Sequence, residues 1–249
     1  MELIKTNEEL IEICESISKE KFITIDTEFI REKTYWSKLC LIQICTHDKE
    51  IIIDPLENNI DLKPFIKILN KKSILKILHS GRQDIEIFYK MSGRIPKPIF
   101  DTQIAAMVCG FGESVGYEKL VEKTLNKKID KSSRFSNWEK RPLTKKQLKY
   151  AIGDVTHLYE IYPILNKEII EKKRKVWLED ELKILLSEET YDVSPENAYK
   201  RLKIRSYDIK TRGVTYQLAL WREKKAQLNN IPRGRVLRDD VIYELASIK

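Results

Sequence analysis

The hydrophobic and polar positions of the chain follow strand spacing in the first part and helix spacing later. Residues 7–19 alternate apolar and acidic positions as an amphipathic helix does, and the β-branched run at 21–29 predicts a strand. Two further apolar runs at 39–45 and 50–54 are separated by a polar turn at 46–49. These three strands predict an antiparallel meander.

Strand and helix patterns then alternate, and helical patterns fill the second half. Residues 61–69 predict a helix, 74–78 a fourth strand, 85–89 part of another helix and 99–100 a short fifth strand. Near the end, helical segments at 215–227 and 239–247 are separated by a break at 229–232. The pattern predicts an α/β fold, in which a mixed five-stranded sheet is flanked by helices and followed by a small all-α C-terminal segment.

The net charge of +8 is concentrated in the last fifth of the chain. Residues 200–249 contain 13 Lys and Arg against 5 Asp and Glu, whereas residues 1–199 contain 33 of each. A basic segment on a neutral body is typical of proteins that bind nucleic acid. A solvated lysine-rich surface gives the same count, so charge alone leaves both interpretations open.

The composition argues against several classes of protein. The N-terminal residues are acidic and periodic, unlike a signal peptide, and no apolar run approaches the ~20 residues of a membrane span. The cysteines form no Cys-x-x-Cys pair and have no histidine at metal-ligand spacing: Cys14, Cys40, Cys45 and Cys109. We therefore expect reduced thiols in a cytoplasmic protein.

Asp26 and Glu28 lie two residues apart on the strand predicted at 21–29. Because strand side chains alternate between faces, both carboxylates project on one side, while Ile23 and Ile25 can be buried on the other. Neighbouring anions repel unless a proton or a cation lies between them. An exposed acidic edge of the sheet would show the same pattern.

Asp84 lies in the first turns of the helix that follows the fourth strand. Ser80 and Gln83 have the spacing of a capping box, which predicts where this helix begins. An acid in this position is also stabilised by the helix dipole, so Asp84 alone does not indicate a functional site.

Tyr150 and Asp154 are about one helical turn apart. Thr144 and Gln147 again have capping-box spacing. At about 100° per residue, Tyr150 and Asp154 point to the same side of the helix. They flank an apolar stripe formed by Leu148, Ile152, Val155, Tyr159 and Tyr162. The pair could face a cleft, or it could be an ordinary tyrosine–carboxylate contact at the surface.

The order Asp-x-Glu, Asp and Tyr-x-x-x-Asp matches the needs of a two-metal phosphodiesterase. Clustered carboxylates are preferred ligands of Mg²⁺ and Mn²⁺, and they would repel one another without cations. Two such ions about 4 Å apart can turn a water into hydroxide and stabilise the departing 3′ oxygen. A tyrosine beside the attacking water can orient it.

The sequence resembles the ribonuclease D family, whose exonuclease superfamily has a ribonuclease H-like fold and an Asp-Glu-Asp-Asp-Tyr site. The matching stretches are IDTEFIREKTYW (25–36), LIQI (41–44), IIIDPL (51–56), LHSGRQDIEIFY (78–89), IFDTQIAA (99–106) and SNWEKRPLTKKQLKYAIGDVTHLYEIY (136–162). The resemblance implies that two ions, Mg²⁺ or Mn²⁺, are held by Asp26, Glu28, Asp84 and Asp154. It also implies that Tyr150 positions the nucleophilic water.

The weaker candidates for substrate binding are Phe29, Gln43, His79, Trp138 and Arg141. Phe29 resembles the family's aromatic residue that contacts the terminal base, although a core position explains it nearly as well. Gln43 and His79 could face the substrate channel or cap buried polar groups. Trp138 and Arg141 fall in the family's loop before the last catalytic helix. The basic residues of this stretch could grip a phosphate backbone: Lys131, Arg134, Lys140, Lys145, Lys146 and Lys149.

Residues 218–246 resemble the first part of the helicase-and-ribonuclease-D C-terminal module. In the family this module continues through further helices, whereas this sequence stops after about two, so it is either a fragment or a reduced module. We therefore expect three parts: an exonuclease domain at 1–170, a helical connector at 171–206 and a partial C-terminal module at 207–249.

These features predict a 3′–5′ exoribonuclease, with precursor tRNA 3′ ends as the substrate that the resemblance implies. We expect a monomer that binds RNA and no membrane. One alternative is an exonuclease that acts on DNA or in general RNA decay, because nothing in the motif reads the 2′-hydroxyl. The other is a nucleic-acid-binding module with an inactive nuclease centre, against which the intact five-residue set argues.

Overall fold

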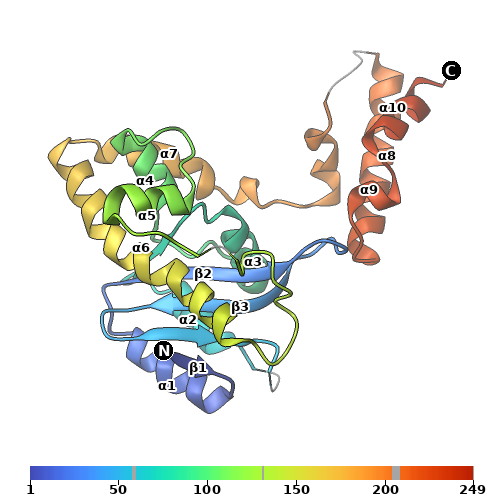
Figure 1. Ribbon diagram of the computed structural model, residues 1–249. Coiled ribbons are helices and arrows are strands. Elements are labelled where there is room, and N and C mark those ends of the chain that lie inside the picture. The colour runs from blue at the N-terminus through green and yellow to red at the C-terminus, as the bar shows by residue number, and fades with distance from the viewer. Residues whose placement is uncertain (58–59, 131, 204–207, 249) are drawn as a thin grey trace. The chain divides into compact units, whose positions relative to one another are not determined.

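The computed structural model describes residues 1–57, 60–130, 132–203 and 208–248 (Figure 1). Contacts divide the chain into two compact units: Met1–Ile30 with Leu39–Thr190, and Arg31–Lys38 with Tyr191–Lys249. A short segment from the N-terminal half thus belongs to the C-terminal unit. The domain boundaries expected at 170/171 and 206/207 remain a prediction, and the second of them lies outside the described residues.

A six-stranded mixed sheet forms the centre of the first unit. Its spatial order is β1 (Glu2–Ile4), β4 (Glu50–Ile53), β3 (Lys38–Cys45), β2 (Phe22–Ile30), β5 (Leu75–Leu78) and β6 (Ile99–Asp101). β1 pairs with β4 in parallel, β5 pairs in parallel with both β2 and β6, and β3 is antiparallel to β4. The predicted mixed α/β sheet is confirmed. The predicted number of five strands is wrong, because the three-residue β1 is too short to show an alternating pattern.

Strand β2 is longer than its partner β5. The pairing joins Phe22–Thr24 to Leu75–Ile77, so Asp26 and Glu28 lie on the part of β2 that follows this ladder. The Thr24 hydroxyl donates to the Val155 carbonyl at 2.8 Å and ties the strand to helix α6. The two acids are therefore positioned by a strand that is fixed at its paired end.

The helices of the first unit pack around this sheet. They are α1 (Asn7–Ile17), α2 (Lys63–Leu69), α3 (Arg82–Ser92), α4 (Thr102–Cys109), α5 (Tyr117–Leu125), α6 (Lys145–Glu171) and α7 (Lys175–Leu185), with the 3-10 turn η1 (Glu188–Thr190). Figure 1 shows α6 crossing one face of the sheet. The predicted capping box of Thr144 and Gln147 starts this helix. Its apolar stripe then buries Val155 against the sheet, together with Ala151 and Ile152.

The capping box expected at Ser80 and Gln83 is wrong. Helix α3 has Gly81 as its N-cap and no side-chain cap, and Ser80 has a left-handed φ of 55°. The amides of Ser80 and Gly81 instead donate to the Asp101 carboxylate at 3.2 and 2.8 Å. Asp101 also caps α4 by accepting from the amides of Gln103 and Ile104. A partner 20 residues away thus fixes the turn before α3.

The second unit is all-α, as predicted for the C-terminal segment. Its elements are η2 (Pro195–Arg201), α8 (Ile209–Leu228), α9 (Arg233–Val236) and α10 (Asp239–Ser247). A small core joins them, made of Ala198, Leu202, Ala219 and Ile242. The segment Arg31–Lys38 is attached by its own contacts, among them a hydrogen bond from the Trp36 amide to Asn230 Oδ1 at 3.0 Å.

Two further findings concern membrane-spanning helices and the cysteines. Among the helices that the structure describes, none has both the length and the apolar character needed to cross a membrane. All four cysteines are buried free thiols.

Candidate metal centre

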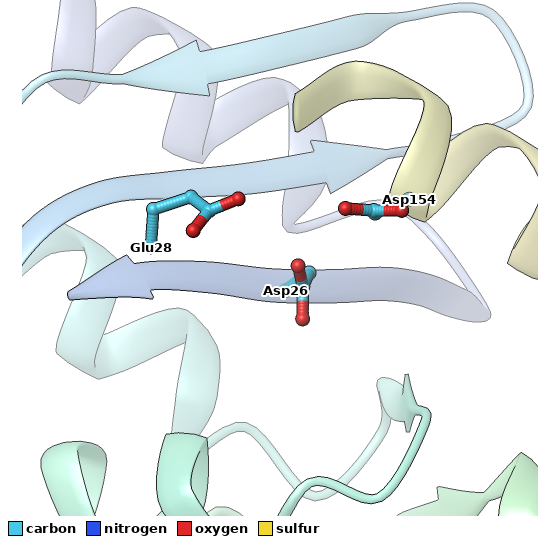
Figure 2. A group of neighbouring side chains, drawn as sticks. All are labelled: Asp26, Glu28 and Asp154. Atoms are coloured by element: carbon cyan, nitrogen blue, oxygen red, sulfur yellow. The ribbon is translucent and has the colours of Figure 1, made fainter. Parts of the chain in front are cut away.

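Three carboxylates meet beside the second half of β2. Asp26 and Glu28 project from the strand, and Asp154 reaches them from α6 (Figure 2). One carboxylate oxygen from each residue lies within 4.8 Å of the others, and all three residues are partly exposed. Residues that are far apart in sequence are thus brought together as a candidate metal site.

Asp84 lies beside this cluster, in the first turn of α3. The side chain is nearly buried, and its Oδ1 accepts a hydrogen bond from the Thr27 hydroxyl at 2.5 Å. Asp84 does not belong to the set whose oxygens lie within 4.8 Å of one another. Its role as a fourth ligand therefore remains a prediction.

The carboxyl groups share an unfavourable electrostatic environment. Burial, and then the charges of Asp84, Asp154 and Glu28, raise the pKa of Asp26 well above its usual range. Burial, and then the charges of Asp154 and Asp84, raise the pKa of Glu28 to about 9. Burial also raises the pKa of Asp84 to about 6 and that of Asp154 to about 7. Without a counter-charge, Glu28 therefore retains its proton at neutral pH.

This donor set fits a divalent metal ion. It consists of carboxylate oxygens, the ligands that Mg²⁺ and Mn²⁺ prefer. Opposite ligands of an octahedral Mg²⁺ lie about 4.2 Å apart, since each lies at about 2.1 Å from the ion. One oxygen from each of Asp26, Glu28 and Asp154 lies within 4.8 Å of the others, so a small shift would let all three reach one ion. A cation would also supply the positive charge that the cluster lacks.

Tyr150 lies beside Asp154 on the same helix. Its hydroxyl lies close enough to the Asp154 carboxylate for each group to influence the pKa of the other. Burial, and then the charges of Asp154, Glu28 and Asp26, raise the pKa of Tyr150 far above its usual range. The phenol thus stays protonated at physiological pH, so it can orient a water molecule by hydrogen bonding but cannot act as a general base.

A pocket of about 390 Å³ opens beside Asp26, Tyr150 and Asp154. This volume is in the range of small-ligand pockets. His79, Tyr117 and Arg134 are among its other walls. The Tyr117 hydroxyl donates to the Asp154 backbone carbonyl at 2.7 Å, which helps to fix this turn of α6. The charge of Arg134 opposes the effect of burial on the pKa of Asp154.

Three of the weaker substrate-binding candidates lie on or next to the sheet. Gln43 is fully buried on β3, and neither of its amide atoms has a partner among the described residues. His79 lines the pocket, with Nδ1 at 3.0 Å from the Thr102 hydroxyl and a buried Nε2 that has no described partner. Phe29 is half-buried and follows Glu28 on β2, so it projects to the opposite face of the strand.

The other two candidates brace the loop before α6. Trp138 is buried in the core, and its ring centroid lies 6.0 Å from that of Tyr150. Arg141 donates to both oxygens of the buried Asp54 carboxylate, each at 2.6 Å, and to the Cys40 carbonyl at 3.0 Å. This geometry favours a positioning role for Arg141 over the predicted contact with RNA. The substrate-binding roles of all five candidates remain predictions, and Lys131 of the basic stretch lies outside the described residues.

Sequence reasoning missed two residues of the site, Thr27 and Tyr117. Thr27 lies between the two acids of β2 and holds Asp84, but in the sequence it is an ordinary β-branched strand residue. Tyr117 contacts the backbone of α6 from 37 positions away, and no local pattern indicates such a contact. Asp54 carried one signal, since it falls in the IIIDPL stretch of the family resemblance.

Several known proteins are similar to this chain. Residues 1–170 match the family described as 3′–5′ exonuclease. The chain is 45% identical over 246 residues to ribonuclease D of Nitrobacter hamburgensis, a match that covers 99% of this chain and 64% of that protein. It is 46% identical over 250 residues to ribonuclease D of Jannaschia sp., covering 99% of this chain and 65% of that protein.

A solved structure of Escherichia coli RNase D, described as an exoribonuclease involved in structured RNA processing, has the same fold. The TM-score is 0.90 at 33% sequence identity, and the match covers 98% of this chain and 65% of that one. This similarity confirms the expected ribonuclease H-like fold. The chain spans a little less than two thirds of the length of these three relatives.

Proposed function

This chain belongs to the 3′–5′ exonuclease family, and we propose that it hydrolyses RNA from the 3′ end with two divalent ions, Mg²⁺ or Mn²⁺, as cofactors. The observation that carries this proposal is the convergence of Asp26, Glu28 and Asp154 beside the Tyr150 hydroxyl. We assign the metal ligands to these three acids together with Asp84, which Thr27 holds next to them.

The protonation states of the acids and of Tyr150 suit this reaction. Cations favour the ionised forms of Asp26 and Glu28, because they compensate the burial and mutual repulsion that raise the pKa of both groups. Tyr150 remains protonated and orients the attacking water by a hydrogen bond. The acids would hold two such ions, which would lower the pKa of the attacking water and stabilise negative charge on the departing 3′ oxygen.

RNA is the proposed substrate, and precursor tRNA 3′ ends are the proposed class. The support is that relatives matching nearly the whole chain are named ribonuclease D. The basic excess of residues 200–249 fits a polyanionic partner. A monomer in the cytoplasm is part of this proposal, and the four free thiols fit that compartment.

We also propose the division into an exonuclease domain at 1–170, a connector at 171–206 and a partial C-terminal module at 207–249. The family match ends at residue 170, which supports the first boundary. One segment, Arg31–Lys38, lies within the first domain in sequence but packs with the C-terminal unit.

Single strands of RNA and DNA with one sequence and a 5′ label provide the test. We expect a ladder of shortened RNA with Mg²⁺ or Mn²⁺, none with EDTA, and none when a 3′-phosphate blocks the end. Faster shortening of DNA than of RNA would favour the DNA exonuclease instead. If neither strand is shortened with any metal, the inactive binding module replaces the proposal.

A further inference from the structure

The second unit contains a pocket of about 490 Å³ that is lined by four arginines. They come from successive elements of this unit: Arg201, Arg222, Arg233 and Arg238. Two carboxylates, those of Asp239 and Asp240, belong to the same walls. All of these residues follow position 170, where the family match ends. The pocket is therefore a feature of the C-terminal unit alone.

Arg222 is the most deeply placed of the four arginines, with a side chain that is 4% exposed. Its Nη1 donates to the Leu237 carbonyl at 3.0 Å and to Asp239 Oδ1 at 2.5 Å. Its Nε is buried and has no partner among the described residues. Leaving a buried guanidinium N–H without an acceptor is unfavourable. An oxyanion bound in the pocket would bring acceptor oxygens to this group.

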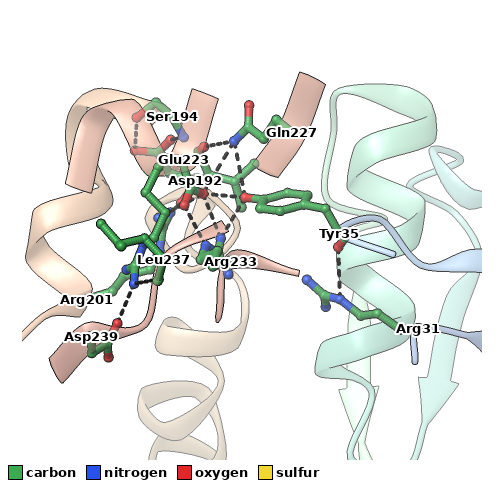
Figure 3. Close-up of polar contacts among 12 residues, drawn as sticks. Arg31, Tyr35, Asp192, Ser194, Arg201, Glu223, Gln227, Arg233, Leu237 and Asp239 are labelled. Atoms are coloured by element: carbon green, nitrogen blue, oxygen red, sulfur yellow. Dashed lines mark hydrogen bonds and ion pairs between the residues drawn. The ribbon is translucent and has the colours of Figure 1, made fainter. Parts of the chain in front are cut away.

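Glu223 holds two further arginines in place (Figure 3). This carboxylate is fully buried and accepts hydrogen bonds from Arg233 Nε at 2.5 Å and Nη2 at 2.7 Å. It also accepts from Arg201 Nη1 at 3.2 Å and from the Tyr35 hydroxyl. Because Arg201 and Arg233 are already ordered, an incoming anion does not have to immobilise them, and that lowers the entropic cost of binding.

The pocket remains positively charged after its acids are counted. Four guanidinium groups line it, against Asp239 and Asp240 on the walls and Glu223 behind two of the arginines. A small positive excess suits one singly charged phosphodiester better than a highly charged anion. Guanidinium groups also match phosphate oxygens in geometry, since they donate paired N–H bonds.

We propose that this pocket binds one phosphate group of an RNA strand and so forms an RNA contact outside the metal centre. Free inorganic phosphate offers the arginines the same oxygen acceptors as an RNA phosphodiester. The choice of RNA therefore rests on the proposed function. A strand long enough to reach the pocket gains affinity from this contact. A very short oligonucleotide engaged at the metal centre gains nothing from it.

The Arg222 Nε–H resonance in ¹⁵N NMR spectra reports directly on occupancy. The full chain in EDTA is titrated with a single-stranded RNA of about 20 nucleotides, and separately with inorganic phosphate. We expect the resonance to shift at low RNA concentration and only at far higher phosphate concentration. A shift with phosphate and none with RNA would assign the pocket to the free ion. No shift with either would remove the site.

Arg238→Gln and Arg235→Gln form a matched pair. Both remove one positive charge from an exposed arginine, but only Arg238 lines the pocket. The dissociation constant for the same RNA should rise about fivefold in Arg238→Gln and less than about twofold in Arg235→Gln. If RNA binding weakens equally in the two variants, the net charge of the protein explains the effect and the proposal is overturned.

Gly234→Asp is a second probe, because it adds a carboxylate to the pocket wall without a clash. A Cβ at Gly234 meets no atom within 4 Å, so the fold should be retained, which a thermal melt verifies. RNA affinity should fall further than in Arg238→Gln, and unchanged affinity would count against the pocket.

Cleavage of a trinucleotide should be unaffected in both Arg238→Gln and Gly234→Asp. If wild-type protein binds RNA in this pattern but cleaves none, the proposed function fails and the pocket stands.

Discussion

Two clusters of charged side chains in the described part of the molecule are balanced in opposite ways. Beside the second half of β2, acids face other acids, and burial with mutual repulsion raises the pKa of Asp26 and Glu28. Around Glu223, burial alone would raise the pKa as well. Hydrogen bonds from Arg233 and Tyr35, with the charges of Arg233 and Arg201, outweigh it and lower the pKa of Glu223 below its usual value.

The difference separates a cluster that lacks a counter-charge from one whose charges are compensated within the chain. The chain supplies every counter-charge that Glu223 needs, so this carboxylate contributes to the fold without any external ion. The β2 cluster is electrostatically unfavourable by itself and improves only when protons or cations enter. Mutations at the β2 cluster should therefore mainly lower activity, whereas mutations of Glu223 should mainly lower stability.

The largest expected effect is on activity at the β2 cluster. Asp26→Asn or Asp154→Asn should lower the rate of RNA hydrolysis by at least about 10³-fold, because each removes a metal ligand. The melting temperature in EDTA should stay the same or rise, since repulsion is relieved. The exposed Asp48→Asn is the matched control and should keep full activity. Hydrolysis at the wild-type rate in either ligand variant would refute the metal-site assignment.

The second effect is the loss of stability when Glu223 is neutralised. Glu223→Gln removes the negative charge between Arg201 and Arg233, and breaking such a buried pair typically costs about 3 kcal/mol. Urea unfolding followed by circular dichroism measures the change, with the exposed Glu244→Gln as the control. If both variants unfold at the same urea concentration, the Glu223 cluster does not hold the second unit together.

The third effect tests Tyr150 apart from metal binding. Tyr150→Phe removes the hydroxyl near Asp154 but keeps the ring beside Trp138. The rate constant for hydrolysis should fall about 10²-fold with little change in RNA affinity, as when a positioned hydrogen-bond group is lost. Tyr159→Phe on the same helix, whose ring stacks on Phe22 at 4.7 Å, is the control. Wild-type turnover in Tyr150→Phe would leave this tyrosine with a structural role only.

Local patterns predicted the parts of the molecule that depend on neighbouring residues. The alternation along β2 places Asp26 and Glu28 on one face, and the helical spacing places Tyr150 beside Asp154. The Thr144 capping box likewise needs only residues within one turn. The candidate ligands could therefore be proposed from spacing, and the family resemblance connected them into one site.

Contacts between distant positions could not be predicted in this way. Tyr35 and Glu223 are 188 residues apart, and nothing in REKTYW indicates that this segment packs with the C-terminal helices. Arg141 looks like an RNA-binding residue in its basic stretch, yet it bonds to Asp54, 87 residues away. The start of α3 depends on Asp101, 20 residues from Gly81. In each case the partner comes from another element, and the local pattern does not indicate it.

The smallest expected effect is the pH dependence of stability in metal-free protein, and it tests the imbalance of the β2 cluster most directly. The folded-state pKa is raised to about 9 for Glu28 and to about 7 for Asp154, above the values of an unfolded chain. A raised carboxyl pKa contributes stability that is fully present below the unfolded pKa and is lost as pH rises through the folded pKa. In EDTA, the melting temperature should therefore fall by a few degrees between about pH 5 and pH 9.

With Mg²⁺ the decrease in melting temperature should be smaller, because bound cations favour the ionised acids. Asp26→Asn should flatten the EDTA profile, whereas Asp48→Asn should leave it unchanged. A wild-type profile that rises with pH in EDTA would mean that the acids are already compensated within the chain, as Glu223 is.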